Sequence, residues 1–348
     1  MNIIRKISLA FLVFALCVPL SCSEQFNINA PYKEIWVVYG ILSLSDSVQY
    51  IRVSKAYQVE GDAYEYAKEN DLSVKGLRVL LRQGDKIWQA RQIDSIPKEE
   101  GIFYPYTTAY KFNTAKGDSA LIPNRRYELI IQQPNDSSFE LRAHTTLPHP
   151  PTLQKPSIQR IDNQYCLDYL TVEDSISVAF VGREFGAMFP GNGYTLTLLL
   201  DYYENTTKKR FIWREGSLYS PKNPTVSGAF TIAPNVIPNS FTSLVADTAK
   251  SYTYQNQPTC ATELSSLTKV AKVEVAALDS FLWTYYIINT PNYFTLSTVK
   301  PIYTNLKGTA ACIGLFGSTS KTQVPFALTA CGEYKMRLNK TLPPPDCP

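Results

Sequence analysis

The chain has 348 residues, with 34 Lys and Arg against 30 Asp and Glu, and 45% of its residues are hydrophobic. This length suffices for more than one domain. The charge is nearly balanced and interspersed, and no basic stripe interleaves with aromatics, so the sequence does not indicate a nucleic-acid partner. The 23 Tyr and 16 Phe, with Val, Ile and Thr in short runs between turn residues, predict a mainly β fold.

The first two dozen residues predict export. Two basic residues precede an apolar run of about 14 residues, which is shorter than the roughly 20 needed to span a bilayer. Ser21 then precedes Cys22, and this pair resembles the lipobox of bacterial lipoproteins, in which the cysteine becomes the N-terminus and carries acyl chains. We therefore expect residues 1–21 to be a lipoprotein signal peptide and Cys22 to be lipidated. An ordinary cleaved signal peptide is the alternative.

The segment after the cysteine, residues 22–31, is predicted to be a tether. Its Ser23-Glu24-Gln25 run resembles the acidic or polar tags of surface-exported lipoproteins of the Bacteroidetes phylum, and a plain polar tether is the alternative. Several acyl chains on one cysteine hold a protein to a membrane stably. We expect a lipid-anchored protein of the outer membrane, and the sequence leaves open whether it faces the periplasm or the cell surface.

A first module is predicted at residues 32–146. It contains about seven short apolar or alternating runs separated by turn residues, which is typical of an immunoglobulin-like β-sandwich. The runs are at 35–42, 48–54, 77–82, 86–90, 104–112, 126–131 and 139–144. A glycine-containing connection predicts that the third and fourth runs form a hairpin. Residues 60–70 fit a loop or one short helix, and Trp36, Trp88 and Tyr127 are expected in the core.

A proline-rich linker at 147–156 is expected to separate this module from a second β-rich module at 157–348 with one or two short helices. Its strand-like runs are at 175–181, 194–200, 210–213 and 269–277. Asp279 is expected to cap a helix that ends near Asn289. Residues 214–262 are rich in Ser, Pro, Asn and Thr and are predicted to form long surface loops, where binding residues often lie. The small residues at 308–317 predict a strand over which another element packs closely.

Seven cysteines occur, of which Cys17 belongs to the signal segment. Excluding that residue and the lipidated cysteine leaves five, all in the second half of the chain. They are Cys166, Cys260, Cys312, Cys331 and Cys347. An exported protein permits disulfides, so we expect at most two bridges and one free thiol, with the pairing left open. No two cysteines have the CxxC spacing of a zinc site.

No motif for catalysis or for a cofactor is present. The sequence lacks G-x-S-x-G, HExxH, a P-loop and GxGxxG. The two histidines, His144 and His149, are predicted in a strand and in the proline-rich stretch. A glycosidase needs two carboxylates close together in space, but the spacing of the carboxylates along this chain does not indicate such a pair. These carboxylates include Asp201, Glu204, Glu274 and Asp279. We therefore predict a non-enzymatic protein without a cofactor or a metal.

One short pattern, Asp followed by Ser or Thr and then by Ala, Val or Ile, recurs five times. It matches the O-glycosylation motif used in the Bacteroidetes phylum, and chance would give roughly one or two copies. The candidate acceptors are Ser47, Ser95, Ser119, Ser175 and Thr248. The alternative is that Asp-Ser simply suits turns and strand starts.

The order of these motifs resembles one known family. After the lipobox come VVYGIL, VQYIRVSKAY, GLRVLLRQGDKIW and LIPNRRYELII, and near the end VEVAALDSFLWTYY and TNLKGTAACIGLFGSTS. Together they are similar to the Bacteroidetes outer-membrane lipoprotein family known as domain of unknown function 4249. The resemblance implies an outer-membrane lipoprotein beside a TonB-dependent receptor, and it brings no catalytic residue.

Our first expectation is therefore a binding or accessory protein next to a TonB-dependent transporter, with residues 214–262 as its contact surface. The second is a structural or adhesive surface protein. The third is a carbohydrate-binding module or hydrolase, in which tyrosines would stack on sugar rings.

Overall fold

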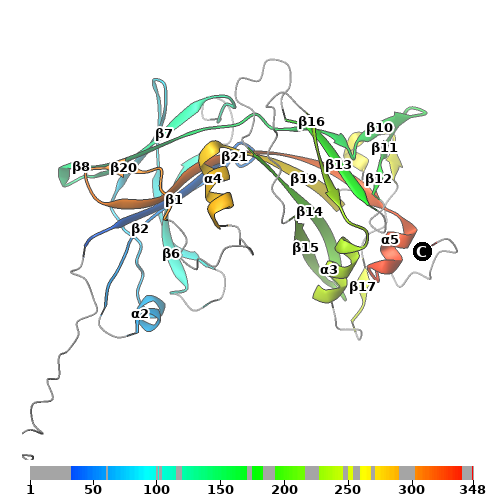
Figure 1. Cartoon of the computed structure of the whole chain (residues 1–348), viewed down its shortest axis with the longest axis horizontal. Coiled ribbons are helices and arrows are strands. Elements are labelled where there is room, and N and C mark those ends of the chain that lie inside the picture. The colour runs from blue at the N-terminus through cyan, green and yellow to red at the C-terminus, as the bar shows by residue number, and fades with distance from the viewer. Residues whose placement is uncertain are drawn as a thin grey trace, which may run out of the picture. The chain divides into compact units, whose positions relative to one another are not determined.

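The computed structural model describes residues 33–59, 62–98, 101, 104–114, 120–170, 175–182, 193–215, 227–245, 250–253, 259–267, 271–289, 302–338 and 347. The fold is mainly β, as predicted, and its sheets have a sandwich-like arrangement. Within this part of the chain, one ten-stranded sheet contributes to two hydrophobic cores, each completed by residues of a smaller sheet (Figure 1).

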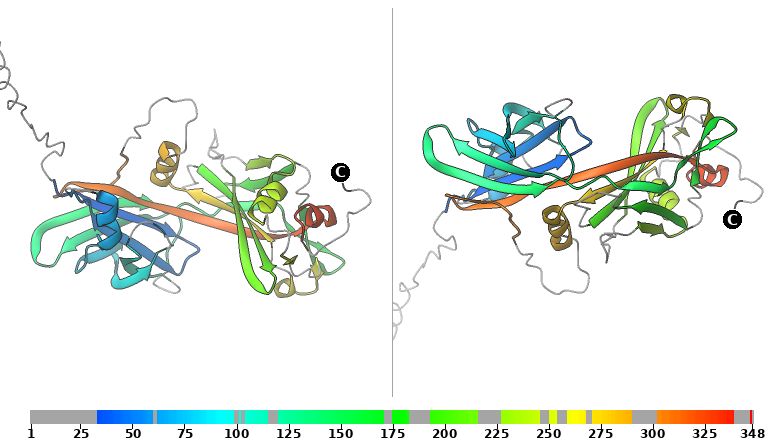
Figure 2. Two further views of the ribbon diagram at one scale, coloured as in Figure 1. Left: turned by 90° about the horizontal axis from the view of Figure 1, so that it is seen from below. Right: turned by 90° about the horizontal axis from the view of Figure 1, so that it is seen from above.

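The ten-stranded sheet is joined through one long strand, β21 (Cys312–Leu328). The first half of β21 pairs in parallel with β1 (Trp36–Ser43), and its second half pairs antiparallel with β19 (Ala271–Leu278). Figure 2 shows this strand in orange, running from one group of strands to the other. The remaining strands of the sheet are β2 (Val48–Lys55), β5 (Arg91–Pro97), β6 (Tyr106–Asn113), β12 (Tyr169–Leu170), β14 (Gly193–Glu204), β15 (Thr207–Arg214) and β17 (Tyr252–Thr253).

The first core lies between this sheet and a five-stranded sheet. The latter contains β3 (Arg78–Gln83), β4 (Lys86–Gln89), β7 (Arg126–Gln133), β8 (Asp136–Thr146) and β20 (Lys307–Gly308). The predicted core aromatics Trp36, Trp88 and Tyr127 are all buried here. The ring of Trp36 lies 4.4 Å from that of Phe139 on β8, so the two sheets pack directly on each other.

The predicted hairpins and short helix around the first core are confirmed. The β1–β2 and β3–β4 hairpins form, and Gly84 takes a positive φ of 58° in the second turn. A short helix, α2 (Ala63–Glu69), occupies the stretch predicted as a loop or helix. The side chain of Asp62 caps it by accepting a hydrogen bond from the Tyr64 N–H at 2.7 Å.

The second core lies against the other end of the ten-stranded sheet. It is covered by a sheet of β9 (Thr152–Lys155), β13 (Ile176–Val181) and β16 (Ser227–Ile232), together with α3 (Val236–Leu244) and the end of α5 (Ala330–Lys335). With α4 (Ser280–Asn289), the described part of this half has three α-helices, where the sequence predicted one or two, and a 3₁₀ turn at Leu264–Ser266.

The prediction that residues 214–262 form loops is wrong for much of that stretch. It contains β16, α3, β17 and β18 (Cys260–Ala261). Its polar composition indicated loops, but Phe230, Ile237 and Phe241 are buried in the second core. Burial of these few apolar residues outweighs the weak local propensity of the residues around them.

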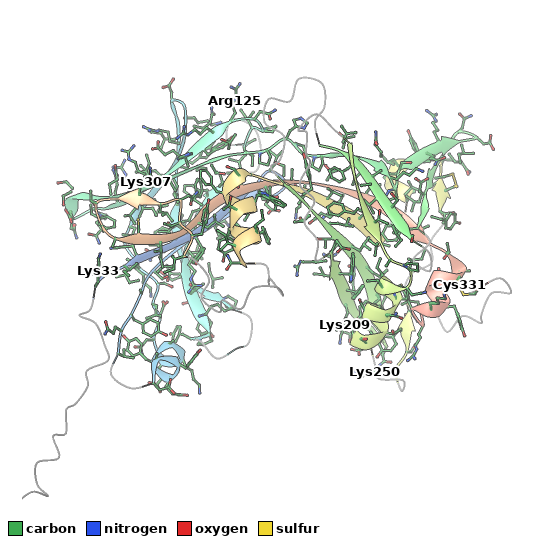
Figure 3. All side chains as sticks on the ribbon, viewed as in Figure 1. Lys33, Arg125, Lys209, Lys250, Lys307 and Cys331 are labelled. Carbon is green, nitrogen blue, oxygen red and sulfur yellow. A yellow bond between two sulfur atoms is a disulfide. The ribbon has the colours of Figure 1, made fainter. Side chains whose placement is uncertain are left out.

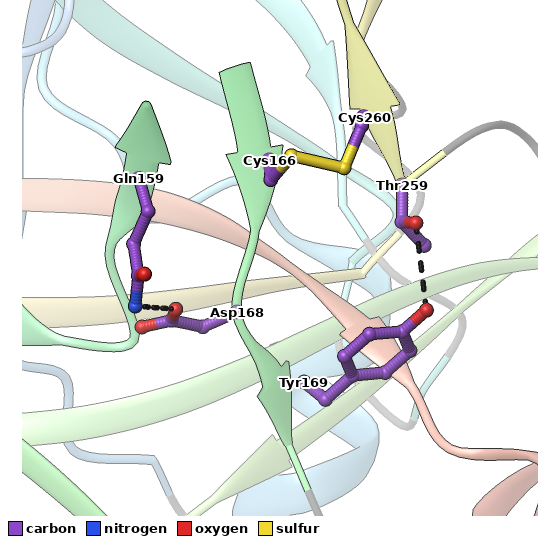
Figure 4. The surroundings of a disulfide bond; sticks show 6 residues. All are labelled: Gln159, Cys166, Asp168, Tyr169, Thr259 and Cys260. Carbon is purple, nitrogen blue, oxygen red and sulfur yellow. Dashed lines mark hydrogen bonds between the residues drawn. A yellow bond between two sulfur atoms is a disulfide. The ribbon is translucent and has the colours of Figure 1, made fainter. Parts of the chain in front are cut away.

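Two disulfides are present among the described residues. Cys166 and Cys260 join β18 to β11 (Gln164–Leu167), which also pairs with β10 (Ile158–Ile161), as Figure 4 shows. Cys331 on α5, labelled in Figure 3, is bonded to Cys347. Cys312, at the start of β21, is a free thiol whose pKa is raised by burial.

The proline-rich segment between the two covering sheets is held along β21. Proline has no N–H, so its stretch presents mainly carbonyl groups to its surroundings. Hydroxyl groups on one face of β21 donate to them: Ser318 to the carbonyl of Thr146 at 3.0 Å, and Ser320 to that of Pro148 at 2.6 Å. These bonds fix the path of the chain as it leaves β8.

Candidate functional site

Helix α4 packs on the face of β21 opposite the two cores. Leu282 of the helix, Leu278 and Leu315 of the strands form a small buried cluster there. At Gly317, a Cβ atom would lie 3.0 Å from the Cβ of Leu282, so a larger residue would push the helix away. This confirms the prediction that small residues in this strand permit another element to pack closely over it.

Asp279 anchors the start of this helix, as predicted. It is 4% exposed, and its Oδ1 accepts a hydrogen bond from the Leu282 N–H at 2.8 Å. Its Oδ2 accepts from the hydroxyl of Thr145 on β8 at 2.6 Å, and that hydroxyl lies 2.7 Å from Ser318 Oγ. Burial raises the pKa of Asp279, which its hydrogen bonds partly offset. One carboxyl group thus ties together α4, β8 and β21.

A cavity of about 470 Å³ lies beside α4, on the side of β1 and β2. Its walls are mainly aromatic and aliphatic. They include Tyr39 and Ile41 of β1, Tyr50 of β2, and Tyr285 and Tyr286 of α4, with Leu315 of β21. Tyr39 and Tyr50 are 42% and 48% exposed because odd residues of β1 and even residues of β2 face away from the core. The phenol of Tyr39 has a raised pKa, chiefly through burial, so it stays protonated at neutral pH.

A second cavity, of about 440 Å³, adjoins the first. The two share Ile41, Asp46, Leu282 and Tyr286 as lining residues. The second is more polar, because it reaches β14, β15 and β19. Its polar lining consists of Ser43, Asp46, Thr195, Thr197, Arg214, Glu215, Glu274, Thr319 and Lys321. We call the two adjoining cavities the α4 groove.

The polar end holds charged groups of both signs, with three carboxylates and two cations. Glu274 lies 3.4 Å from the ammonium group of Lys321 and accepts a hydrogen bond from Gln323 at 2.6 Å. Arg214 adds a second cation, and Asp46 and Glu215 add carboxylates. The groove therefore combines aromatic walls with polar groups of both signs, which is the composition of a small-molecule binding site.

The carboxylates noted in the sequence do not gather into one site. Asp201 accepts from Arg210 at 2.5 Å, and this hydrogen bond is the main cause of its lowered pKa. Glu204 pairs with Lys209 and, at 2.9 Å, with Lys250; Figure 3 labels both lysines. Of the remaining two, Glu274 is held by Lys321 and Gln323, and Asp279 caps α4. Among the described residues, no group of three His, Cys, Asp or Glu side chains could hold a metal ion.

The two histidines lie apart from these groups. His144 is on β8, where its ring packs edge-on against Phe281 at 5.2 Å and burial lowers its pKa. His149 lies in the proline-rich segment, with Nδ1 2.9 Å from the carbonyl oxygen of Pro150.

Three of the five candidate glycosylation acceptors fall within the described part of the chain. Ser47, Ser95 and Ser175 are all exposed, so each could carry a glycan without disturbing the core. Ser119 and Thr248 lie outside the described residues, as does the lipidation candidate Cys22.

The α4 groove itself was missed at the sequence level. Tyr39 and Tyr50 lie on one hairpin, but Tyr286 is more than 200 residues away along the chain, and only the packing of α4 brings it to them. The one available signal was the alternation in β1, where Tyr39 and Ile41 stand on the face opposite Val38 and Leu42.

Comparison with known proteins adds no assignment. No family model matches the chain, and no curated protein matches it. The resemblance to domain of unknown function 4249 therefore rests on the quoted motifs. In the described part of the chain, no helix is long and apolar enough to cross a membrane.

Proposed function

We propose that this protein is a lipid-anchored, non-enzymatic binding protein of the outer membrane, acting as an accessory to a TonB-dependent transporter. The observation that carries the binding role is the α4 groove, an open aromatic cavity on the side of the sheet away from both cores. The lipobox-like Ser21-Cys22 pair and the order of the family-like motifs support the location and the partner.

Binding fits the groove better than catalysis does. Asp279 is buried and lines neither cavity, and its carboxyl group is engaged by Leu282 and Thr145 as the cap of α4. The carboxylate of Glu274 is held by Lys321 and Gln323. A general acid or base must be within hydrogen-bond reach of its substrate, whereas Asp279 lies outside the cavities and Glu274 is already paired.

The proposed contact surface moves from residues 214–262 to the α4 groove. The earlier choice rested on long exposed loops, but α3 and β16 direct Phe230 and Phe241 into the core. The tyrosines of the groove, in contrast, retain large exposed fractions on rigid strands. Aromatic side chains that are held in place give contact area at little cost in conformational entropy.

Recovery of the native complex tests this function. The full-length protein, tagged after Pro348, would be purified from membranes in several mild detergents and its companions identified by mass spectrometry. We expect a TonB-dependent receptor in near-stoichiometric amount. A matched Cys22→Ser variant, lacking the anchor, should leave the membrane fraction and recover no receptor. Isolation of the lipoprotein alone in every detergent would contradict the accessory role and favour an adhesive or structural one.

A further inference from the structure

The α4 groove has the chemistry of a carbohydrate site, and we propose that it binds a neutral oligosaccharide. This inference rests on the proposed binding function and deepens it by naming the class of ligand. Three features of the groove carry it: its aromatic faces, its polar lining of both signs and an unsatisfied hydroxyl group.

The aromatic faces lie on rigid elements. Tyr39 and Tyr50 come from paired antiparallel strands, and Tyr286, 42% exposed, comes from the helix that walls the same cavity. A tyrosine has an apolar ring and a polar tip that stays wet. A sugar ring has the matching character, because its axial C–H bonds form an apolar face and hydroxyl groups surround its edge. Stacking on such rings gives affinity without requiring charge on the ligand.

The groove carries little net charge, because its three carboxylates are opposed by two cations. Two cations, Arg214 and Lys321, line the polar cavity together with the carboxylates of Asp46, Glu215 and Glu274, and Lys321 is already paired with Glu274. An anionic ligand would meet three carboxylates, and a cationic one would meet two positive groups. A lining that offers both donors and acceptors suits a ligand that carries many hydroxyl groups. The hydroxyl groups of Thr195, Thr197 and Thr319 line the same cavity.

An unsatisfied polar atom adds an independent observation. Ser43 is 6% exposed and lines the polar cavity, yet within the described residues its Oγ has no hydrogen-bond partner. Buried polar atoms in folded proteins nearly always have a partner. Its neighbour Gln49 is fully engaged, since its side chain bonds both the N–H and the carbonyl of Ser43. A rotation of the Ser43 hydroxyl toward a ligand in the cavity would satisfy it.

Isothermal titration of the detergent-purified mature lipoprotein tests this assignment. The probes are maltohexaose, cellohexaose, xylohexaose and mannohexaose as neutral ligands, with hexagalacturonate as the anionic control and a glucosamine hexamer as the cationic one. We expect at least one neutral probe to bind more tightly than either charged probe. Absence of binding to all four neutral probes, or preference for a charged one, would overturn the proposal.

Variants locate the binding. The Tyr39→Ala/Tyr50→Ala double variant should weaken binding by roughly tenfold or more, since each stacked ring contributes an aromatic contact. Ser43→Ala should weaken it by roughly two- to tenfold. Tyr64→Ala is the matched control, because Tyr64 is a 63% exposed tyrosine on α2 outside the groove, and it should bind as the wild type does. Circular dichroism of each variant checks its fold. Equal binding by the double variant and the control would refute the site.

The result of the sugar-binding experiment can be distinguished from the result of purifying the native complex from membranes. Recovery of a receptor without sugar binding would leave the accessory function standing and remove the carbohydrate ligand. Sugar binding without recovery of a receptor would support the carbohydrate ligand and contradict the accessory function.

Discussion

Replacement of Asp279 by alanine tests how α4 is held against the sheet. The carboxyl group caps the helix through the Leu282 N–H and accepts a hydrogen bond from Thr145. Alanine removes both acceptors at once. Because Leu282 also packs on Gly317, loosening the first turn of α4 should loosen the wall of the groove as well.

The magnitude follows from three contributions. Loss of an N-cap side chain costs about 1 kcal/mol. Loss of a hydrogen bond to a charged acceptor costs about 1.5–3 kcal/mol, less where the donor finds another acceptor, and the Thr145 hydroxyl has Ser318 Oγ 2.7 Å away. Removing the buried charge offsets part of this, since burial disfavours the ionised carboxyl. We expect Asp279→Ala to lower the free energy of unfolding by about 2 kcal/mol at pH 7.

The effect should depend on pH in a defined direction. The pKa of Asp279 is raised in the folded protein above its ordinary value of 3.8. The folded state therefore binds the proton more tightly than the unfolded state, so the contribution of this group to stability is greatest at low pH. It is lost as pH rises through the folded-state pKa. The deficit of the alanine variant should accordingly be larger at pH 4 than at pH 7.

Urea unfolding followed by tryptophan fluorescence at the two pH values measures this difference. Asp279→Asn is the matched control, because asparagine caps helices about as well as aspartate but does not titrate. It should lose about 1 kcal/mol or less at pH 7. Equal stability of the alanine variant and the wild type would refute the role of Asp279 as an anchor. A smaller deficit at pH 4 than at pH 7 would refute the assignment of the raised pKa to this group.

Three further predictions concern other parts of the molecule. Gly317→Leu should displace α4 and raise the rate of amide hydrogen exchange in the helix, whereas Gly84→Ala, in a distant hairpin, should leave that rate unchanged. Cys22→Ser should abolish labelling of the protein by radioactive palmitate, and continued labelling would contradict the lipid anchor. If the Asp-Ser motif is glycosylated, changing the three exposed acceptor serines to alanine should lower the intact mass of the native protein by more than the mass of the three lost oxygen atoms. A loss equal to the mass of three oxygen atoms would show that these serines carry no glycan. These serines are Ser47, Ser95 and Ser175.

The sequence by itself determined the elements whose signals are local. The hairpin turn at Gly84 and the cap at Asp279 depend on residues a few positions apart, so pattern and turn chemistry predicted them. Alternation along β2 and β19 predicted strands, and cysteine counting bounded the number of disulfides at two. The small residues before Ser318 indicated that something packs closely over this strand, although they did not say which element.

Only the tertiary structure decided which distant segments meet. β21 pairs with β1 across more than 250 residues of sequence, and no local pattern specifies a partner at that distance because strand pairing is set by burial of whole faces. For the same reason β16 and α3 emerged from a stretch that composition assigned to loops. The α4 groove combines side chains from β1, β2, β14, β19 and α4. A site built from so many elements exists only once the sheets and the helix have packed.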